Sequence, residues 1–504
     1  MGEEARADAE IVSAARIAAS RWAAVGLPQR IERIRALRHS IVERMDDIKA
    51  VICEDTGKVE AEALLTDLLP TLEQCLFYEK TAGRFLRPET RRGTMLFSGS
   101  RAHVEYIPYG VVLVIAPWNN PFQLCMVPAM SALLCGNAVI VKPSERTPHV
   151  AAEIKVLFNA AGFDDSLVHV APGGPETARR LIGAHPDLVF FTGGGAGGRE
   201  VLQQAGSLLI PVIAELGGKD PMIVFADADL DEAAQAAVYG AFSHDGQHCI
   251  SVERLYIEAA AYGAFIEAVG AGARELSRGH DLAAALFPDT RTRVLSQIGG
   301  ALEAGARLVT GYENDLPVLP AVVADVTQEM ALMREETFGP VLPVMSFVGE
   351  AEAVRLANDC DFGLNASVWT RDMGKAARVV SHLETGSVVV NGVLTNAGHP
   401  ALPFGGVKRS GFGRYHGPEG LMSFVRPRAV LSRRDASGEI SRFPYDDDLS
   451  AICAELIRLR YGSEKGLLRR LRRWFGLHRK RSARIRMLSR LSWPDRARER
   501  AGGE

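Results

Sequence analysis

The spacing of apolar residues predicts a helical N-terminal part that is followed by alternating strands and helices. Over residues 1–90, apolar side chains recur every three or four positions, for example at Ile34, Leu37 and Ile41. That period is typical of amphipathic helices, and we expect these helices to serve packing alone. Residues 101–108 lack the period and are expected to be extended.

From residue 111 onwards, short and continuous apolar runs alternate with helical sequence. Residues 111–116, 137–141, 167–170 and 188–191 form such runs, which are typical of strands buried on both faces of a parallel sheet. Their alternation with helices predicts a doubly wound α/β fold. By the same reasoning we expect further helices at residues 151–161, 177–182, 199–205, 230–243, 262–275 and 292–304, and further strands at 209–215, 254–257, 341–346, 366–370 and 387–391.

Polar and glycine residues follow the predicted strands at the points where those strands end. Asn119 follows the first strand, Lys142 and Glu145 follow the second, and the glycine-rich stretch 192–198 follows the fourth. Ligands of doubly wound sheets bind beyond the carboxyl ends of the strands, where a glycine loop that opens a helix lets backbone amides approach a pyrophosphate. The G-x-G-x-x-G pattern that begins at Gly193 is weak evidence by itself for dinucleotide binding. We expect a dinucleotide site because the pattern also follows a predicted strand and opens a predicted helix.

Two further stretches carry groups that are suited to nucleophilic catalysis. Cys249 ends the glycine-framed turn 246–249, and Glu215 is followed by the glycine-containing stretch 216–219. A thiol in an open, polar turn can act as a nucleophile, and a carboxylate beside it can act as general base for a water molecule. Each stretch alone also fits a plain loop or a strand-end carboxylate, so the hypothesis depends on their being brought together.

Length and cysteine content narrow the class of protein. At 504 residues the chain should hold at least two domains. Its seven cysteines are scattered and form no CxxC or Cys/His cluster, which favours neither a zinc site nor a disulfide framework and indicates a reducing compartment. The acidic N-terminus has no apolar core of the kind found in a signal peptide, and the apolar runs are too short or too interrupted to span a bilayer. We therefore expect a cytoplasmic protein.

The charge of the chain is concentrated at its C-terminal end. Residues 465–500 hold 14 Lys and Arg residues against two acidic ones, whereas the whole chain has a net charge of −3. A basic amphipathic helix with aromatic residues on its apolar face is typical of membrane-surface binding. A solvated tail and a helix docked on the acidic body are equally open, and nucleic acid is the least favoured partner. The apolar residues at helical spacing are Leu467, Leu471, Trp474, Phe475, Ile485, Leu488 and Leu491.

Six short motifs occur in the order and spacing of one known family. They are Pro117-Trp118-Asn119, Lys142-Pro143-Ser144-Glu145, Phe191-Thr192-Gly193, Glu215-Leu216-Gly217-Gly218-Lys219, Gly246-Gln247-His248-Cys249 with Arg254, and Glu335-Glu336-Thr337-Phe338-Gly339-Pro340. Through them the chain resembles the aldehyde dehydrogenase superfamily over roughly residues 10–430. The short region before Pro117 and the stretch 413–417 are most similar to the class 3 and coniferyl-aldehyde dehydrogenase branch.

The resemblance implies a division into domains. Residues 1–100 and 109–214 would form a Rossmann-like NAD(P)-binding domain, and residues 215–410 an α/β catalytic domain. Segments 101–108 and 411–432 would bridge subunits of a homodimer, and residues 433–504 lie beyond the resemblance as a basic extension. Members of the branch act on aromatic or on medium- to long-chain aliphatic aldehydes, which we expect as substrates.

The resemblance also implies a mechanism and its residues. Cys249 would attack the aldehyde, Asn119 would stabilise the oxyanion, and Glu215 would activate the water that hydrolyses the thioester. No metal is expected. NAD is favoured and NADP is the alternative, because a carboxylate at position 145 would repel a 2′-phosphate. The implied cofactor-binding residues are Lys142, Glu145, Trp118, Thr192, Gly193, Gly194, Gly198, Leu216, Gly217, Glu336 and Phe338.

The chain departs from the family pattern at a few positions. His244 replaces the usual Asn, Ser251 replaces Ala, and Gly194-Gly195 replace Ser-Thr in the nucleotide loop. Asn391 resembles a position near the substrate pocket but equally fits a turn. Two rival functions remain: a CoA-acylating or acyl-phosphate-reducing relative, and a non-catalytic scaffold whose basic tail binds membranes.

Overall fold

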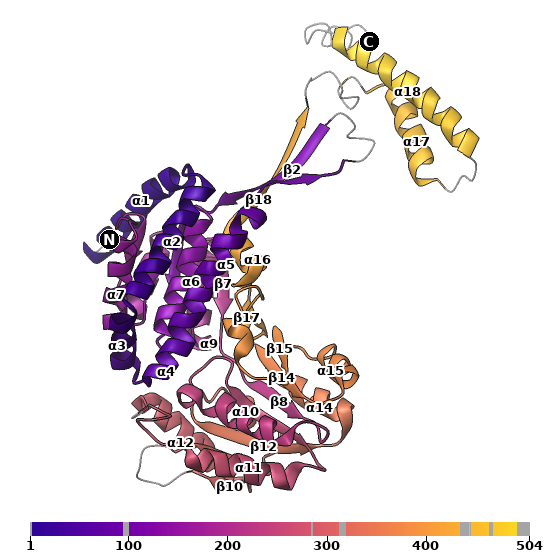
Figure 1. The fold of residues 1–504 in the computed structure, drawn as a ribbon. Helices are drawn as coiled ribbons and strands as arrows, with labels where there is room; N and C mark the ends of the chain where they lie inside the picture. Colours follow the sequence, from indigo (N-terminus) through magenta and orange to yellow (C-terminus); the bar gives the residue numbers. More distant parts are fainter. Residues whose placement is uncertain are drawn as a thin grey trace. The chain divides into compact units, whose positions relative to one another are not determined.

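The computed structural model describes residues 3–93, 100–283, 286–311, 319–433, 443, 445–462 and 467–490. Figure 1 shows its helices and strands. The chain divides into two compact units. Residues 1–87 and 106–426 form the main unit, and residues 88–105 and 427–504 form the extension unit.

The first part of the main unit is helical, as the apolar period predicts. Ile34, Leu37 and Ile41 are at most 1% exposed, so the predicted apolar stripe is the buried face of its helix. The expected extended segment is also confirmed, since it is strand β2 (Ser100–Pro108). The helices are α1 (Glu3–Ala23), α2 (Leu27–Glu43), α3 (Met45–Thr56), α4 (Glu60–Ala63), the π-helix η1 (Leu64–Leu68) and α5 (Leu69–Phe85).

A six-stranded sheet follows, with a topology that leaves a crevice at one edge. Its order is β17 (Gly411–Phe412), β7 (Val212–Glu215), β6 (Leu188–Thr192), β3 (Val111–Ile115), β4 (Ala138–Lys142) and β5 (Val168–Val170). The strands from β3 to β7 are parallel, and β17 runs antiparallel to β7. From β3 the chain proceeds to β4 and β5 on one side and later to β6 and β7 on the other. The loops after β3 and β6 therefore diverge, which is where such sheets bind ligands.

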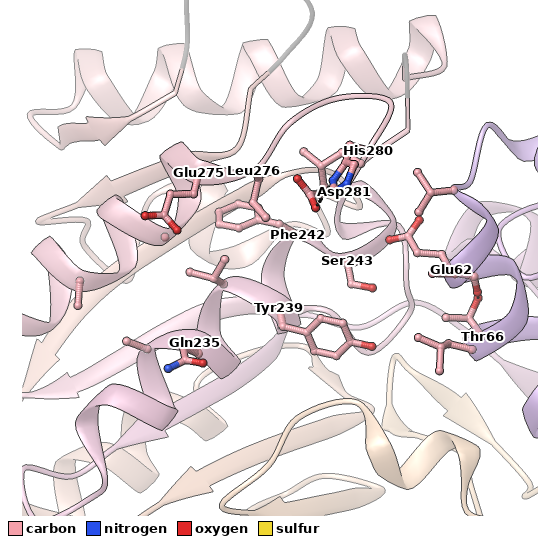
Figure 2. Close-up of a pocket in the computed structure, with 18 of the residues that line it drawn as sticks. Glu62, Thr66, Gln235, Tyr239, Phe242, Ser243, Glu275, Leu276, His280 and Asp281 are labelled. Atoms are coloured by element: carbon pink, nitrogen blue, oxygen red, sulfur yellow. Dashed lines mark hydrogen bonds and ion pairs between the residues drawn. The ribbon is translucent and has the colours of Figure 1, made fainter.

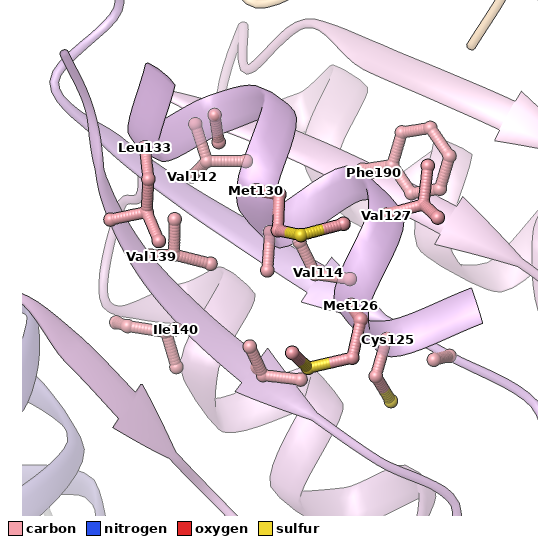
Figure 3. Close-up of a cluster of buried hydrophobic side chains, with 14 of the residues drawn as sticks. Val112, Val114, Cys125, Met126, Val127, Met130, Leu133, Val139, Ile140 and Phe190 are labelled. Carbon is pink, nitrogen blue, oxygen red and sulfur yellow. The ribbon is translucent and has the colours of Figure 1, made fainter. Parts of the chain in front are cut away.

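Helix α6 (Pro121–Leu134) forms the centre of the core beside this sheet. Every residue of α6 is buried, as expected for a helix that is apolar on all sides. Figure 3 shows Met126, Met130 and Leu133 of α6 among the strand residues Val114 and Val139. The other helices of this part are α7 (Pro148–Ala160), α8 (Pro175–Gly183) and α9 (Gly195–Ser207).

A second, seven-stranded sheet completes the main unit. Its order is β10 (Arg307–Thr310), β11 (Ala321–Ala324), β12 (Val341–Phe347), β9 (Val252–Glu258), β8 (Asp220–Val224), β14 (Asn365–Trp369) and β15 (Ser387–Val390). β10 is antiparallel to its neighbour, and the remaining pairs are parallel. Helices α10 (Leu230–Phe242) and α11 (Tyr262–Glu275) cover one face, and α12 (Pro288–Glu303), α14 (Gly349–Asn358) and α15 (Met373–Val380) cover the other. The two sheets confirm the predicted α/β fold.

Several elements differ from the sequence-based predictions. Strand β7 begins at Val212 and not at residue 209, because Pro211 has no N–H to donate to a ladder. Helix α9 begins at Gly195 and not at residue 199, so the end of the glycine loop forms its first turn. Strand β8 was missed because Pro221 argues against a central strand; a register shift between Asp220 and Pro221 accommodates it. β10, β11, α14 and α15 are short elements that were likewise not predicted.

The extension unit contains a small sheet and a helical hairpin. The sheet has the order β1 (Glu89–Arg91), β2, β18 (Val425–Arg433), and the hairpin is formed by α17 (Asp447–Tyr461) and α18 (Leu467–Arg490). Ile452 and Leu477 are buried in the hairpin, and Arg484 pairs with Asp446 at 2.6 Å. The predicted helix is confirmed as far as residue 490, and Leu491 lies outside the described residues.

Candidate active site

Cys249 lies in the loop between the 3-10 helix η3 (Ser243–Gly246) and β9, where two cavities meet. His244 and Asp245 in η3 have positive φ angles of 48° and 56°, so the chain turns sharply after α10. The turn leaves Cys249 half-buried at the wall of both cavities. One is an inner cleft of about 270 Å³, and the other is an apolar channel of about 330 Å³. The thiol can therefore be approached from two sides.

The inner cleft continues into an outer cleft of about 590 Å³ along the carboxyl edge of the six-stranded sheet. Pro117, Thr192, Gly193 and Gly194 line both clefts. The two clefts bring together the residues predicted for catalysis and cofactor binding, except Gly198. Lys142 and Glu145 line the outer cleft, and Trp118, Asn119, Glu215, Leu216, Gly217, Glu336 and Phe338 line the inner cleft.

Two glycines are in close contact with side chains around the clefts. A Cβ on Gly217 would overlap the Glu336 carboxylate, and a Cβ on Gly198 would meet the Leu216 side chain at 2.5 Å. Gly198 thus acts through helix–strand packing, which is the usual role of the third glycine in a dinucleotide loop. By contrast, a Cβ on Gly194 would meet nothing within 4 Å. The space beside it is open to a ligand.

Glu215 ends β7 and lies against the thiol. Its side chain is buried at 3% exposure, and its carboxyl group lies beside Cys249 in the inner cleft. Burial raises the pKa of Glu215 to about 8, and the contact with Cys249 partly offsets that rise. Burial and the Glu215 carboxyl raise the pKa of Cys249 well above its usual range. At neutral pH the thiol therefore keeps its proton and Glu215 is largely protonated, so the thiol can pass its proton only to the ionised fraction of Glu215.

The Asn119 amide is oriented by the nucleophile loop itself. Its Nδ2 donates to the Gln247 carbonyl oxygen at 2.9 Å, and its side chain is 3% exposed. This bond ties the loop after β3 to the loop that carries Cys249. An amide N–H held beside a nucleophile is a suitable donor for an oxyanion.

A buried ion pair connects the Glu215 stretch to the loop that carries Glu336 and Phe338. Lys219 Nζ donates to Glu253 at 2.7 Å and to the Thr337 hydroxyl at 2.9 Å. Glu253 accepts in turn from the backbone N–H groups of Thr337 and Phe338, each at 2.8 Å. Phe338, at φ 48°, lies edge-on to Trp118 with centroids 5.9 Å apart. The pair thus fixes one wall of the inner cleft.

Arg254, which belongs to the nucleophile motif, forms hydrogen bonds that stabilise the structure beneath the site. It is 1% exposed and donates to the carbonyl oxygens of Lys219 and Ala357 at 2.7 Å and 2.9 Å. It lines neither the clefts nor the channel. Its guanidinium satisfies buried backbone carbonyls beneath the site.

The outer cleft contains a charged pair suited to hydroxyl groups. Lys142 Nζ lies 3.5 Å from Glu145 Oε2, with the lysine buried and the carboxylate half exposed. Burial lowers the pKa of Lys142, and the Glu145 charge partly opposes that shift. The lysine is the last residue of β4, so the strand end sets its position.

The apolar channel on the other side of Cys249 is formed by helices and loops that the strand pattern does not predict. Its mouth carries Leu65, Leu69 and Tyr239, which are exposed at 55%, 51% and 48%. Phe404 and Tyr415 lie on its walls. Such a channel suits an apolar ligand that presents one polar group to the thiol.

A chain of hydrogen bonds missed by the sequence reasoning reaches His248. Lys58 Nζ donates to Asn120 Oδ1 and to Asp67, both at 2.6 Å. The lysine thereby orients the Asn120 amide, so that Nδ2 faces His248 Nδ1 at 3.2 Å. His248 Nδ1 is then the acceptor, and its proton lies on Nε2. Burial lowers the pKa of His248 to about 3, so a neutral ring lies next to Cys249.

Comparison with known proteins decides the family. Residues 2–430 match the model of the aldehyde dehydrogenase family. The chain belongs to this family. Membership of the family confirms the expected type of activity, which is NAD(P)-dependent oxidation of an aldehyde to an acid. The placement in the class 3 branch stays a prediction.

Individual aldehyde dehydrogenases and relatives cover most of the chain. It is 45% identical over 437 residues to a 4,4′-diapolycopene aldehyde oxidase of a Methylomonas species, covering 85% of this chain and 82% of that one. A putative succinate-semialdehyde dehydrogenase [NADP(+)] of Mycolicibacterium smegmatis is 34% identical, with 83% of each chain covered. In structure, a putative aldehyde dehydrogenase from Anabaena variabilis is similar with a TM-score of 0.81 and 31% identity, over 87% of this chain and 96% of that one. A betaine aldehyde dehydrogenase from Staphylococcus aureus in complex with NAD+ has a TM-score of 0.79 and 27% identity, over 85% and 87%.

The structure shows which groups surround the residues that depart from the aldehyde dehydrogenase pattern. His244 is fully buried and donates its backbone N–H to Glu62, and burial lowers the pKa of its ring well below the usual value. Ser251 Oγ accepts from the His248 N–H at 3.3 Å. Asn391 bonds Thr370 through both amide atoms and lines none of the cavities around Cys249. Its place is that of a turn residue.

Proposed function

We propose that the protein oxidises apolar aldehydes to carboxylic acids with NAD, and that Cys249 is its nucleophile. The observation that carries this proposal is the position of the thiol, which lines a polar cleft on one side and an apolar channel on the other. An aldehyde that enters through the channel and a nicotinamide that enters through the cleft would meet at one sulfur atom. The Glu215 carboxyl group lies beside the same thiol in the inner cleft.

The first step is addition to the aldehyde. The Cys249 thiol gives its proton to Glu215, and the sulfur forms a bond to the carbonyl carbon while the π electrons move to the oxygen. The Asn119 amide and the Cys249 backbone N–H donate to that oxygen. Loss of one such donor costs about 10²–10³ in rate. A nicotinamide held by Glu336 would supply the acceptor for the hydride of this carbon, and Cys249 would then carry the acyl group as a thioester.

Hydrolysis completes the reaction. Glu215 first releases to solvent the proton that it took from the thiol. Its carboxylate then accepts a proton from water as the water oxygen attacks the thioester carbon. The carbon–sulfur bond breaks with its electron pair on the sulfur, the Cys249 thiolate takes the proton from Glu215, and the carboxylic acid leaves through the channel. A CoA-acylating or acyl-phosphate-reducing enzyme would pass the thioester to another acceptor, whereas the Glu215 contact supports water as the acceptor.

The clefts fit a dinucleotide. The open space at Gly194 and the N-terminus of α9 would receive the pyrophosphate. Lys142 and Glu145 would hold the adenosine ribose, and Glu336 would hold the nicotinamide ribose. The remaining predicted residues, Trp118, Thr192, Gly193, Leu216, Gly217 and Phe338, line the space between them. The half-exposed Glu145 supports NAD over NADP, because its charge would repel a 2′-phosphate.

The sheets support the expected division of labour. We assign cofactor binding to residues 1–100 and 109–214, whose sheet carries the outer cleft, and catalysis to residues 215–410, which carry Cys249. Segments 101–108 and 411–432 are assigned to bridging in a homodimer. The edge strand β15 supports a dimer, because Val388, Val389 and Val390 present an uncharged edge.

The deciding experiment is NADH formation, followed by absorbance, with short aliphatic, long-chain and aromatic aldehydes. We expect turnover with the apolar members and its loss in Cys249→Ala, with cofactor binding retained. Equal rates in the Cys249→Ala variant would exclude Cys249 as the nucleophile. A protein that binds NAD but oxidises none of the aldehydes would favour the scaffold function instead.

We also propose that α18 brings the enzyme to anionic membrane surfaces, where apolar aldehydes partition. Trp474 and Phe475 are exposed at 37% and 65% on a helix rich in arginine. No helix in the described part of the chain is long and apolar enough to cross a bilayer, so contact would be peripheral. A cytoplasmic location stays a prediction.

Liposome cosedimentation tests the tail. Full-length protein should sediment with anionic vesicles, and a 1–432 truncation should stay in the supernatant while its activity on a short aldehyde is unchanged. The double variant Trp474→Ser/Phe475→Ser should bind more weakly, because it keeps every charge and loses the apolar anchor. Equal sedimentation of full-length and truncated protein would exclude a membrane role for the tail.

A further inference from the structure

A second cavity, larger than the apolar channel, opens beside the mouth of that channel. We call it the side pocket; it has a volume of about 890 Å³. Helices α10 and α11 form one side of it, and α4 with η1 form the other. Figure 2 shows Tyr239 at its centre, with the hydroxyl end directed towards Thr66. The mechanism proposed above makes no use of this space.

The side pocket and the apolar channel share a wall. Leu65, Thr66 and Tyr239 line both cavities, and Leu65 and Tyr239 are about half exposed. These side chains therefore form a low ridge between the two spaces. A ligand that leaves the channel at its mouth meets the side pocket directly across this ridge.

The lining of the side pocket suits an uncharged hydrocarbon. The apolar part of the lining comes from α10, from α11 and from the residue that follows α11. These residues are Ala234, Val238, Phe242, Ala268, Gly272 and Leu276. The charged groups that line it include four carboxylates, those of Glu62, Asp231, Glu275 and Asp281. They would repel an anionic ligand, so a phosphate-bearing or carboxylate-bearing tail is disfavoured. Glu62 is already engaged, since it accepts from the His244 backbone N–H.

We propose that the side pocket binds the distal part of a long, neutral hydrocarbon aldehyde whose carbonyl carbon lies at Cys249. The proposal rests on the proposed function and specifies its substrate class: chains too long for the channel alone. Short aldehydes would occupy only the channel. Long ones would cross the ridge at Tyr239 and bury their far end against α10 and α11, on the side of the pocket that faces α4 and η1.

A chain-length series tests the proposal. Burial of one further methylene is worth about a fourfold gain in affinity, so kcat/KM should rise from butanal to octanal and rise again towards hexadecanal. The variant Ala268→Trp places a large side chain in the side pocket from an exposed position that does not line the channel. It should match the wild type on butanal and lose at least tenfold on hexadecanal. Val238→Glu, in α10 on the same side of the pocket, should act in the same way.

The control is Ala351→Trp, an equally exposed alanine in α14 on the other face of the sheet. It should leave the whole series unchanged. Parallel chain-length profiles for Ala268→Trp and the wild type would overturn the proposal.

A binding measurement separates this proposal from the proposed function. The neutral dye Nile red should fluoresce on binding the wild type and be displaced by hexadecanol but not by butanol, and Ala268→Trp should bind it at least tenfold more weakly. If no aldehyde is oxidised, the proposed function fails, and this measurement decides the side pocket alone. Unchanged dye binding in Ala268→Trp would overturn it.

Discussion

At the scale of single residues, the central feature is a proton shared between a thiol and a carboxyl group. Cys249 and Glu215 are in contact inside a buried pocket, and burial disfavours the charged form of each. Activation of the thiol therefore depends on Glu215 being ionised. The pKa of Glu215, about 8, places that ionisation within reach of ordinary assay conditions.

The first prediction concerns the pH profile. Because the base acts only when ionised, and its pKa is raised to about 8, kcat/KM should increase tenfold per pH unit below pH 8 and level off above it. Glu215→Gln should lower kcat/KM by about 10²–10⁴ and abolish the rise of kcat/KM below pH 8. Stopped-flow and steady-state NADH measurements from pH 6 to 10 would check both. If Glu215→Gln keeps the rise of kcat/KM below pH 8, the titration of another group causes that rise.

The second prediction concerns the glycine beside Glu336. In Gly217→Ala the new Cβ would overlap the Glu336 carboxylate, so that side chain must move from the cleft wall. NADH affinity, measured by fluorescence titration, should fall at least tenfold. Gly206→Ala is the matched control, since a Cβ there meets nothing within 4 Å and Gly206 lines neither cleft. If both variants bind NADH like the wild type, Glu336 does not hold the cofactor.

At the scale of elements, one buried ion pair joins the N-terminal helices to the site. Asp67 in η1 accepts from the N–H groups of Phe122 and Gln123 at 3.0 Å and 3.1 Å, which caps α6. Lys58 neutralises it, and both side chains are fully buried. The N-terminal helical layer, predicted to serve packing alone, thus also orients Asn120 and His248.

The third prediction follows from this pair. Lys58→Met would leave the Asp67 carboxylate buried without its counter-charge, which costs about 3–5 kcal/mol. The urea midpoint of unfolding should fall accordingly. Arg307→Met, which breaks the exposed pair with Asp325 at 2.9 Å, should change stability by at most about 1 kcal/mol. Equal effects of the two variants would show that Lys58 is not the counter-charge of Asp67.

At the scale of the whole molecule, the proposed dimer rests on strand β15 at one end of the seven-stranded sheet. β15 is the last strand in the order and pairs with β14 on its inner side. Natural sheets protect such edges with charged residues or cover them, and β15 carries three consecutive valines and no charge. A second subunit would supply the cover.

The fourth prediction tests the dimer. Val389→Lys introduces a charge on the edge strand and should convert a dimer to a monomer at micromolar concentration, as measured by light scattering. Val348→Lys is the control, because Val348 is 73% exposed at the end of β12. It should leave the molar mass unchanged. If the wild type is itself a monomer at this concentration, the proposal of a homodimer is wrong.

The sequence by itself determined the parts that depend on local order. Apolar runs bounded by glycine and polar residues predicted the parallel strands and the edge where Asn119, Lys142 and the glycine loop meet, because buried strands and helices leave periodic signals. The motifs around Glu215, Cys249 and Glu336 predicted a common site. Strand β8 was not predicted, because its sequence signal is short and includes Pro221.

Only the tertiary structure decided what lies around the thiol. The Lys58–Asn120–His248 chain, the apolar channel and the side pocket are each built from segments more than 50 residues apart in the sequence. No local pattern records such a contact, because a cavity exists only once the helices that line it are packed. The same holds for the shifted pKa values of Glu215 and Cys249, which arise from burial and proximity in the folded chain.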